Sequence, residues 1–188
     1  MFEFKDGMIF YHGSYCEVKE PDLTKCSKEK DFGKGFYLTT SKDQAKSFLK
    51  TSIIKAVNDG KIKKNQNYGY ISIYRLDLSH ELKVHFFEST DAQWLHCIAA
   101  HRKNELFGGI ENEMSKFDVI VGKIANDATN TTLTAYLSGA FGVVGEKDTY
   151  DFCIKQLLPN NLKDQYCFKT VTALECLKFV ESEKIWIK

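Results

Sequence analysis

The stretch DFGKGFYLT, residues 31–39, decides the fold of this chain. Two glycines flank a single lysine and lead directly into residues 36–38, which have the composition of a β-strand. Glycine allows positive φ and lets another group approach the backbone closely. Ser41, followed three residues later by Gln44, has the pattern of a capping box, so a helix should begin at once. The stretch therefore predicts a glycine-rich loop that delivers Tyr37 onto a strand just before a helix N-terminus.

Strand and helix patterns mix along the rest of the chain without strict β-α-β alternation, which predicts an α+β fold. A strand over residues 8–11 runs into His12-Gly13-Ser14, and an amphipathic helix is expected over residues 41–59. Further strands are expected at residues 70–78, 82–86, 117–122, 164–168 and 185–187. Further helices are expected at residues 90–102, opened by a capping box of Thr90 and Gln93, and at residues 132–137, 147–158 and 170–179, with a turn at 125–127.

Length and composition indicate one globular domain over residues 1–188. Twenty-six lysines and arginines nearly balance 25 aspartates and glutamates, so overall charge favours no class of partner. No apolar run approaches the roughly 20 residues of a membrane span, and the N-terminus lacks the pattern of a signal peptide. We therefore expect a cytoplasmic protein without a membrane partner, although delivery into another cell stays open.

The metal-binding residue types are scattered. The six cysteines form no Cys-x-x-Cys pair, and His96 and His101 lie five residues apart, off the helical spacing of a metal pair. We expect reduced thiols, ordinary helix histidines and no metal. Standard nucleotide-binding and hydrolase motifs are also missing from the sequence.

Three segments form the constellation that stands out: His12-Gly13-Ser14, the stretch GKGFYLT at residues 33–39, and DQYCFK at residues 164–169. Together they resemble the ADP-ribosyltransferase superfamily, in the His-Tyr-Glu branch of the poly-ADP-ribose polymerases and diphtheria-type toxins. The matching family motifs are His-Gly-Ser or His-Gly-Thr, Gly-Lys-Gly-Ile-Tyr-Phe-Ala and Asn-Glu-Tyr-Ile-Val-Tyr. The middle stretch, residues 117–127, is also similar to a bacterial branch of that superfamily that is carried as a domain of unknown function.

The resemblance implies a split, antiparallel-rich sheet core around an NAD cleft, with flanking helices. It implies that His12 hydrogen-bonds a ribose hydroxyl of NAD and that the backbone of Gly13 holds the nicotinamide carboxamide. Ser14 would add a hydrogen bond, and Tyr37 would stack on the nicotinamide ring. NAD would thus be the substrate bound at this site.

Two further residues belong to the implied site. Gly35 would keep the loop slim where the cofactor enters. Phe48, eleven residues after Tyr37, lies where the polymerases carry a second aromatic, and it could complete an aromatic sandwich. It also lies on the apolar stripe of its helix, so core packing is an equal alternative.

The position of the family's catalytic glutamate is occupied by Gln165. An amide can hydrogen-bond a ribose hydroxyl, but it carries no charge to stabilise a cation and cannot act as a general base. Three outcomes follow: single transfer to an acceptor that is already nucleophilic, replacement of the carboxylate by Asp164 or Asp127, or NAD binding without turnover.

The leading hypothesis is a mono-ADP-ribosyltransferase that cleaves NAD at the nicotinamide–ribose bond, with His12, Tyr37 and Gln165 as the catalytic set. The acceptor would be a protein or a nucleic acid. The lysines of residues 61–64 permit a nucleic acid, but an exposed, solvated loop explains them equally well. The family suggests a bacterial toxin or defence effector, for which an antitoxin would be a partner. The alternatives are an inactive NAD-binding or interaction module and an NAD glycohydrolase.

Overall fold

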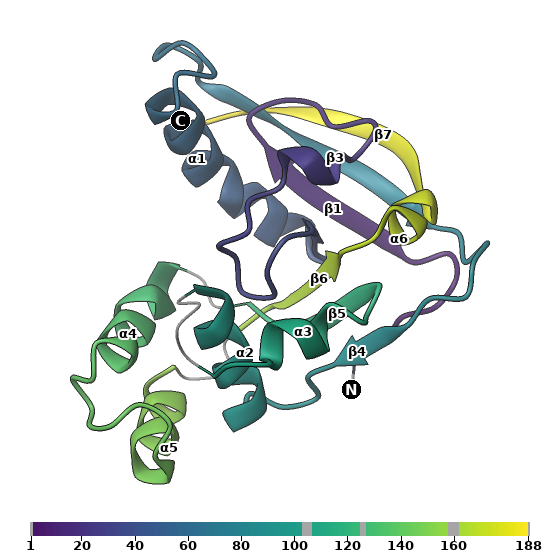
Figure 1. Cartoon of the computed structure of the whole chain (residues 1–188). Coiled ribbons are helices and arrows are strands. Elements are labelled where there is room, and N and C mark those ends of the chain that lie inside the picture. The colour runs from purple at the N-terminus through teal and green to yellow at the C-terminus, as the bar shows by residue number, and fades with distance from the viewer. Residues whose placement is uncertain (1, 103–106, 125–126, 158–161, 188) are drawn as a thin grey trace.

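The computed structural model describes residues 2–102, 107–124, 127–157 and 162–187, with the backbone alone at 127–129. It contains two β-sheets with helices packed around them (Figure 1). The three-stranded sheet runs in the order β1 (Ile9–Ser14), β3 (Tyr68–Leu76), β7 (Leu177–Trp186). The four-stranded sheet runs in the order β2 (Phe36–Leu38), β6 (Asp164–Phe168), β5 (Val119–Lys123), β4 (Val84–Phe86). All strand pairs are antiparallel except β4 with β5, so the α+β prediction is confirmed.

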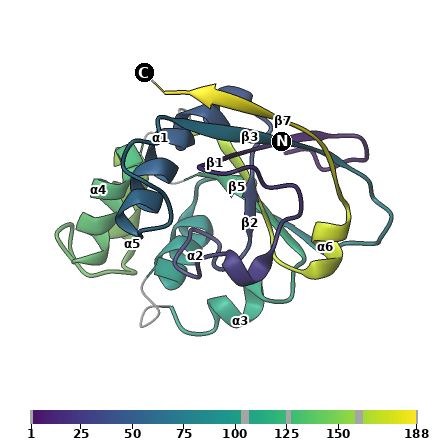
Figure 2. The same ribbon diagram turned by 90° about the horizontal axis from the view of Figure 1, so that it is seen from above.

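The helices divide between the two sheets. In the described part of the chain they are η1 (Leu23–Lys25), α1 (Lys42–Asn58), α2 (Ala92–Arg102), α3 (Ile110–Met114), α4 (Asp127–Leu137), α5 (Lys147–Gln156) and α6 (Val171–Glu175). Helix α1 packs on β1 and β3, whereas α2, α4 and α5 contact one another (Figures 1 and 2). No described helix is long and apolar enough to cross a membrane.

One hydrophobic cluster fills the space between the two sheets. Phe10 of β1 lies with its ring centroid 4.8 Å from that of Tyr166 and 5.7 Å from that of Phe168, both on β6. Phe36 and Leu38 of β2 join the same cluster. Side chains alternate along a strand, so Tyr37 points to the opposite face of β2.

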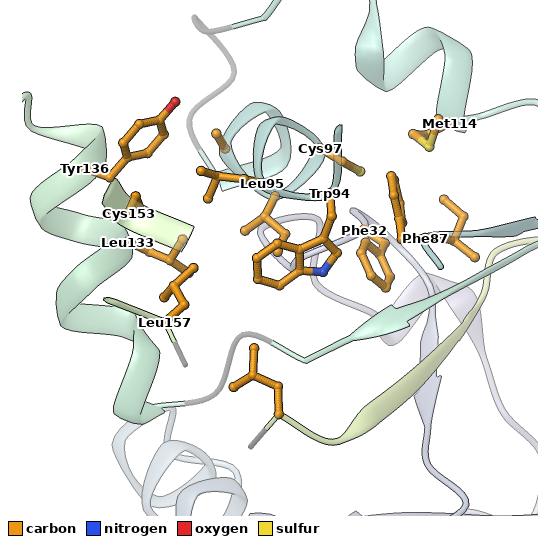
Figure 3. Packing of buried hydrophobic residues seen from close by; sticks show 14 of the residues in the cluster. Phe32, Phe87, Trp94, Leu95, Cys97, Met114, Leu133, Tyr136, Cys153 and Leu157 are labelled. Carbon is orange, nitrogen blue, oxygen red and sulfur yellow. The ribbon is translucent and has the colours of Figure 1, made fainter. Parts of the chain in front are cut away.

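A second cluster fills that opposite face, between the four-stranded sheet and the helices (Figure 3). Trp94 of α2 is fully buried there, and its Nε1 donates a 3.0 Å hydrogen bond to the carbonyl oxygen of Lys123. Phe32, from the glycine-rich loop, stacks on Phe87 with ring centroids 5.5 Å apart. Burying an aromatic side chain contributes about 1.5–3 kcal/mol, so Phe32 anchors the loop to the core.

The two sheets meet where β1 passes β2. The amide of Tyr11 donates to the carbonyl oxygen of Thr39 at 2.8 Å, and the amide of Thr39 donates back at 3.1 Å. This backbone pair joins the His-Gly-Ser segment to the end of the glycine-loop strand.

The helix predicted over residues 41–59 is found as α1, but the cap differs in detail. Ser41 Oγ accepts a hydrogen bond from the Gln44 amide, as in a capping box. The Gln44 side chain instead accepts from Thr39 Oγ1 at 3.1 Å, and Thr39 Oγ1 accepts from the Ser41 amide. The bond from the Ser41 amide to the Gln44 side chain, which a full capping box would have, is thus replaced by two bonds through Thr39 Oγ1.

Four expectations about local structure are wrong. His12-Gly13-Ser14 lies inside β1 rather than after it, because those residues continue the pairing with β3 to Tyr70. Helix α2 is capped by Asp91 rather than Thr90, since Asp91 Oδ1 accepts from the amides of both Gln93 and Trp94.

The helix predicted over residues 170–179 ends at Glu175, and the closing strand begins at Leu177 rather than at residue 185. The long ladder of β7 with β3 provides the competing backbone hydrogen bonds. A helix over Ile110–Met114 was not expected. The predicted turn at 125–127 lies mostly outside the described residues, and Asp127 opens α4.

Candidate functional site

His12 is fixed by the strand that carries Tyr37. Its Nδ1 lies 2.9 Å from the carbonyl oxygen of Tyr37, and because a carbonyl only accepts, Nδ1–H is the donor. Its ring lies 4.5 Å from that of Phe36. Burial lowers the pKa of His12, and the hydrogen bond to Tyr37 opposes that shift only in part. At neutral pH the ring is therefore neutral, with Nε2 as an acceptor.

Gly13 lies on the edge strand of the three-stranded sheet, and no hydrogen bond between its backbone and a group outside that sheet is found among the described residues. In a strand, the backbone groups of residues i and i+2 point to the same edge. Tyr11 uses that edge to pair with Thr39, so the N–H and C=O of Gly13 point the same way, just beyond the pair. A β-carbon on Gly13 would lie 2.0 Å from the carbonyl oxygen of Ala45. Only glycine therefore lets α1 pack this closely on β1.

Ser14 and Phe48 differ sharply in exposure. Ser14 is buried, lies on the same strand face as His12, and its Oγ is 3.9 Å from the Sγ of Cys16. Phe48 is 36% exposed and belongs to none of the hydrophobic clusters. The alternative that Phe48 packs in the core is wrong, because the buried stripe of α1 instead runs through Ala45, Leu49 and Ile53.

Tyr37 ties its hydroxyl to the glycine-rich loop. The hydroxyl accepts a 2.9 Å hydrogen bond from the Phe32 amide and donates a 2.8 Å bond to the Gly33 carbonyl oxygen. Burial raises the pKa of Tyr37 well above its usual value, so the hydroxyl stays protonated. Tyr37 as a residue is half-buried and packs against the cluster on the helix side of the sheet.

The two loop glycines meet crowded surroundings. Gly33 has a φ of 77°, and a β-carbon there would lie 2.5 Å from the ring of His101. A β-carbon on Gly35 would lie 2.3 Å from the Sγ of Cys167. The slimness of the loop therefore serves its packing on β6 and α2.

Gln165 lies on the same face of the four-stranded sheet as Tyr37. Tyr37 is directly opposite Cys167, and Gln165 is two residues away from Cys167 along β6. Such diagonal neighbours lie roughly 7–8 Å apart. Gln165 is 4% exposed, and its Nε2 donates to Asp31 Oδ2 at 2.9 Å and to the Lys123 carbonyl oxygen at 3.3 Å.

Asp31 brings an unexpected carboxylate to this position. It is 6% exposed, and its Oδ1 accepts from Arg102 Nη2 at 2.7 Å and Nε at 3.2 Å. Arg102 Nη1 also donates to Asn130 Oδ1 at 2.9 Å. The sequence stretch that delivers Tyr37 thus also delivers an acid against Gln165.

The two carboxylates expected to replace the family's glutamate have other surroundings. Asp164 forms an ion pair with Lys123, with Oδ1 and Nζ 2.6 Å apart. The side chain of Asp127 lies outside the described part of the structure. A pocket of about 300 Å³ opens beside these strand ends and is lined by Thr39, Thr40, Ser41, Gln44, Lys123, Leu162, Lys163 and Asp164.

His12, Tyr37 and Gln165 therefore come from three adjacent strands, β1, β2 and β6. His12 bonds the backbone carbonyl oxygen of Tyr37 and packs its ring against Phe36, whose side chain lies on the other face of β2. Gln165 shares the face of the Tyr37 side chain. No sequence motif indicates the contacts of Asp31 or Arg102. Asp31 belongs to a loop and lies 134 residues before Gln165, and Arg102 ends a helix and lies 63 residues before Gln165. No group of three or more metal-ligating side chains is found among the residues that the structure describes.

The comparisons with known proteins give one result. No curated protein matches the chain, and no solved structure does. Residues 8–179, which include His12, Tyr37 and Gln165, match one family model, described as "Protein of unknown function (DUF3990)". The chain therefore belongs to the DUF3990 family.

Proposed function

We propose that this protein is an NAD-dependent mono-ADP-ribosyltransferase. The observation that carries the proposal is the junction of β1 and β2, where His12 Nδ1 bonds the Tyr37 carbonyl oxygen and Gly13 offers its N–H and C=O at the edge of the three-stranded sheet. A carboxamide has one acceptor oxygen and an NH₂ donor, which complement these two backbone groups. The resemblance to the His-Tyr-Glu branch supplies the identity of the ligand.

The neighbouring side chains suit the rest of a nicotinamide riboside. The ring of Tyr37, a half-buried residue, offers an aromatic surface for stacking. The Nε2 of neutral His12 offers an acceptor for a ribose hydroxyl. Departure of nicotinamide leaves an oxocarbenium-like sugar, so catalysis depends on holding the cofactor bent and on stabilising that positive charge.

Gln165 limits which transfer we propose. Its amide accepts a hydrogen bond but removes no proton, so it cannot activate an incoming hydroxyl. We therefore propose single transfer to an acceptor that is nucleophilic without help, such as a nucleobase, a guanidinium or a thiolate. Chain-building polymerase activity is not part of the proposal. A cytoplasmic toxin or defence role, with an antitoxin partner, rests on the resemblance alone.

An inactive NAD-binding module is the second candidate, and one observation favours it. The carboxylate nearest Gln165 belongs to Asp31, and it is paired with Arg102 at 2.7 Å. A guanidinium in that position reduces the negative field that a developing cation would feel. NAD would then bind without being cleaved.

Mass spectrometry of purified protein incubated with NAD and a bacterial lysate separates the candidates. The transferase releases nicotinamide and increases the mass of an acceptor by that of one ADP-ribose group. A glycohydrolase releases nicotinamide and free ADP-ribose with no modified acceptor. Intact NAD after prolonged incubation, alongside measurable NAD binding, would support the inactive module and contradict the transferase.

A further inference from the structure

The amide of Gln165 has only one orientation that satisfies its neighbours. Both groups within hydrogen-bond distance of its nitrogen are pure acceptors: the carboxylate of Asp31 and the carbonyl oxygen of Lys123. Turning the amide over would place Oε1 against the oxygens of Asp31 and Lys123, and Nε2 would lose both acceptors. Oε1 of Gln165 is therefore held on the side away from Asp31.

Asp31 is itself held rigidly. Arg102 binds its Oδ1 through two nitrogens, and its Oδ2 accepts from Gln165. The next residue, Phe32, is fully buried, and its carbonyl oxygen accepts a 3.1 Å hydrogen bond from Lys169 Nζ. Tyr37 bonds the Phe32 amide as well. The carboxylate is thus followed directly by a buried residue whose amide and carbonyl are both hydrogen-bonded to side chains.

A carboxylate behind an amide also changes the amide's electrostatics. An N–H that donates to a charged acceptor shifts electron density toward the oxygen of the same amide, and the effect is stronger in a buried, low-dielectric site. Asp31 and Gln165 are 6% and 4% exposed, so water screens this interaction little. The oxygen of Gln165 consequently becomes a better hydrogen-bond acceptor than that of an isolated glutamine.

We propose that Asp31 is a positioning residue that orients the Gln165 amide so that Oε1 accepts a hydrogen bond from a ribose hydroxyl of NAD. This inference rests on the proposed NAD site. It assigns to the glycine-rich loop a role beyond delivering Tyr37, because the same loop sets the acceptor on β6. Asp164 is on β6, the strand of Gln165, but its carboxylate pairs with Lys123 instead of Gln165.

The test compares Asp31→Asn with the control Asp151→Asn, which removes the carboxylate that pairs with Lys147 on α5, away from the site. NAD affinity is measured by calorimetry and the side-chain amide signals of Gln165 by ¹⁵N NMR. Gln165→Glu identifies those signals by removing them. In Asp31→Asn the new amide can donate to Oε1 or accept from Nε2, so only the carbonyl oxygen of Lys123, at 3.3 Å from Nε2, still favours the present orientation. We expect NAD binding about five- to tenfold weaker, the loss of one hydrogen bond, and a marked shift of the Gln165 amide signals. Asp151→Asn should leave NAD affinity within about twofold of wild type and the Gln165 amide signals unshifted, because an exposed ion pair contributes little.

A double variant keeps the test decisive if Asp31→Asn does not fold. Asp31→Asn combined with Gln165→Glu exchanges the amide and the acid and preserves one carboxylate in the pair. We expect it to fold and to bind NAD as tightly as wild type, because a carboxylate at position 165 needs no orientation to accept a hydrogen bond.

The outcomes separate this inference from the proposed function. Wild-type affinity in Asp31→Asn, or unshifted amide signals, overturns the role of Asp31 while leaving the NAD site in place. Equal losses in Asp31→Asn and Asp151→Asn also overturn it, because they point to a general loss of charge. Absence of NAD binding by the wild-type protein overturns the proposed function, and with it the purpose assigned to the pair.

Discussion

The imidazole of His12 is bonded through Nδ1 to the main chain of Tyr37, with 2.9 Å between the nitrogen and the carbonyl oxygen. Two residues that are 25 positions apart in the sequence thereby form one unit at the junction of the sheets. This bond fixes the tautomer of His12 and points Nε2 away from the Tyr37 backbone.

Replacing the imidazole should weaken NAD binding without unfolding the protein. In His12→Ala we expect at least tenfold weaker binding, since the acceptor for the ribose hydroxyl is lost. His80→Ala is the matched control, because His80 is an exposed histidine outside this site. Calorimetry with NAD measures both variants, and equal affinity in the two would remove His12 from the site.

The tight contact of β1 with α1 predicts a large effect at Gly13. Gly13→Ala would place a methyl group 2.0 Å from the Ala45 carbonyl oxygen, and backbone cannot move aside cheaply. We expect destabilisation of roughly 3 kcal/mol. Gly108→Ala is the control, since nothing lies within 4 Å of a β-carbon there. Urea denaturation followed by circular dichroism measures both variants. Equal midpoints would contradict the close packing of α1 on β1 at Gly13.

The hydroxyl of Tyr37 should matter for loop stability more than for stacking. Tyr37→Phe removes the bonds to the Phe32 amide and the Gly33 carbonyl oxygen, so we expect a loss of about 1–2 kcal/mol in the free energy of unfolding. The ring remains, so NAD affinity should change little, whereas Tyr37→Ala should lose most of it. Thermal unfolding and NAD calorimetry measure both variants. Equal NAD affinities of Tyr37→Phe and Tyr37→Ala would contradict stacking of the Tyr37 ring on NAD.

Four buried or half-buried histidines predict loss of stability in acid. Burial lowers the pKa of His12, His85, His96 and His101. The unfolded chain, with histidine pKa values of about 6.5, then binds more protons than the folded protein. Stability should therefore be fully present above that pH and fall as the pH drops toward the lower folded-state values. Urea midpoints at several pH values measure this slope, and a midpoint that rises on acidification would have the wrong sign.

His96 offers a variant that isolates part of this effect. Its Nε2 is buried without a hydrogen-bond partner among the described residues, and its ring stacks on Phe107 with centroids 4.1 Å apart. His96→Phe should keep the stacking and make the acid slope shallower. An unchanged slope would show that His96 is not one of the groups that titrate on unfolding.

Gln165→Glu tests whether the amide limits the chemistry. The new carboxylate would face Asp31 at the present 2.9 Å contact, so like-charge repulsion should raise its pKa and destabilise the variant at neutral pH. Since the folded state then holds a proton that the unfolded state releases, the stability of the variant relative to wild type should rise as the pH falls. If the amide limits turnover, nicotinamide release should increase. Release equal to that of wild type would show that charge at position 165 is not the limiting feature.

Local patterns in the sequence predicted much of this fold. The glycine-rich loop, α1 and the central strand β5 carry strong short-range signals: paired glycines, a capping residue and a continuous apolar run. The helix predicted over residues 170–179 failed because pairing with a strand one hundred residues earlier outweighed its local pattern.

The candidate site divides in the same way. His12, Tyr37 and Gln165 were predicted from segments that resemble known motifs, and the structure brings their three strands together. The role of Asp31 could not be read from the sequence, because its partners lie on α2 and β6 and nothing near Asp31 marks them. Contacts over such separations depend on the fold as a whole.

The most direct test of the central claim is calorimetric titration of the wild-type protein with NAD, with His12→Ala measured in parallel. The account predicts one NAD per chain and at least tenfold weaker binding by His12→Ala. No binding by wild type at millimolar NAD, or the same affinity in His12→Ala, would contradict the NAD site at the junction of β1 and β2.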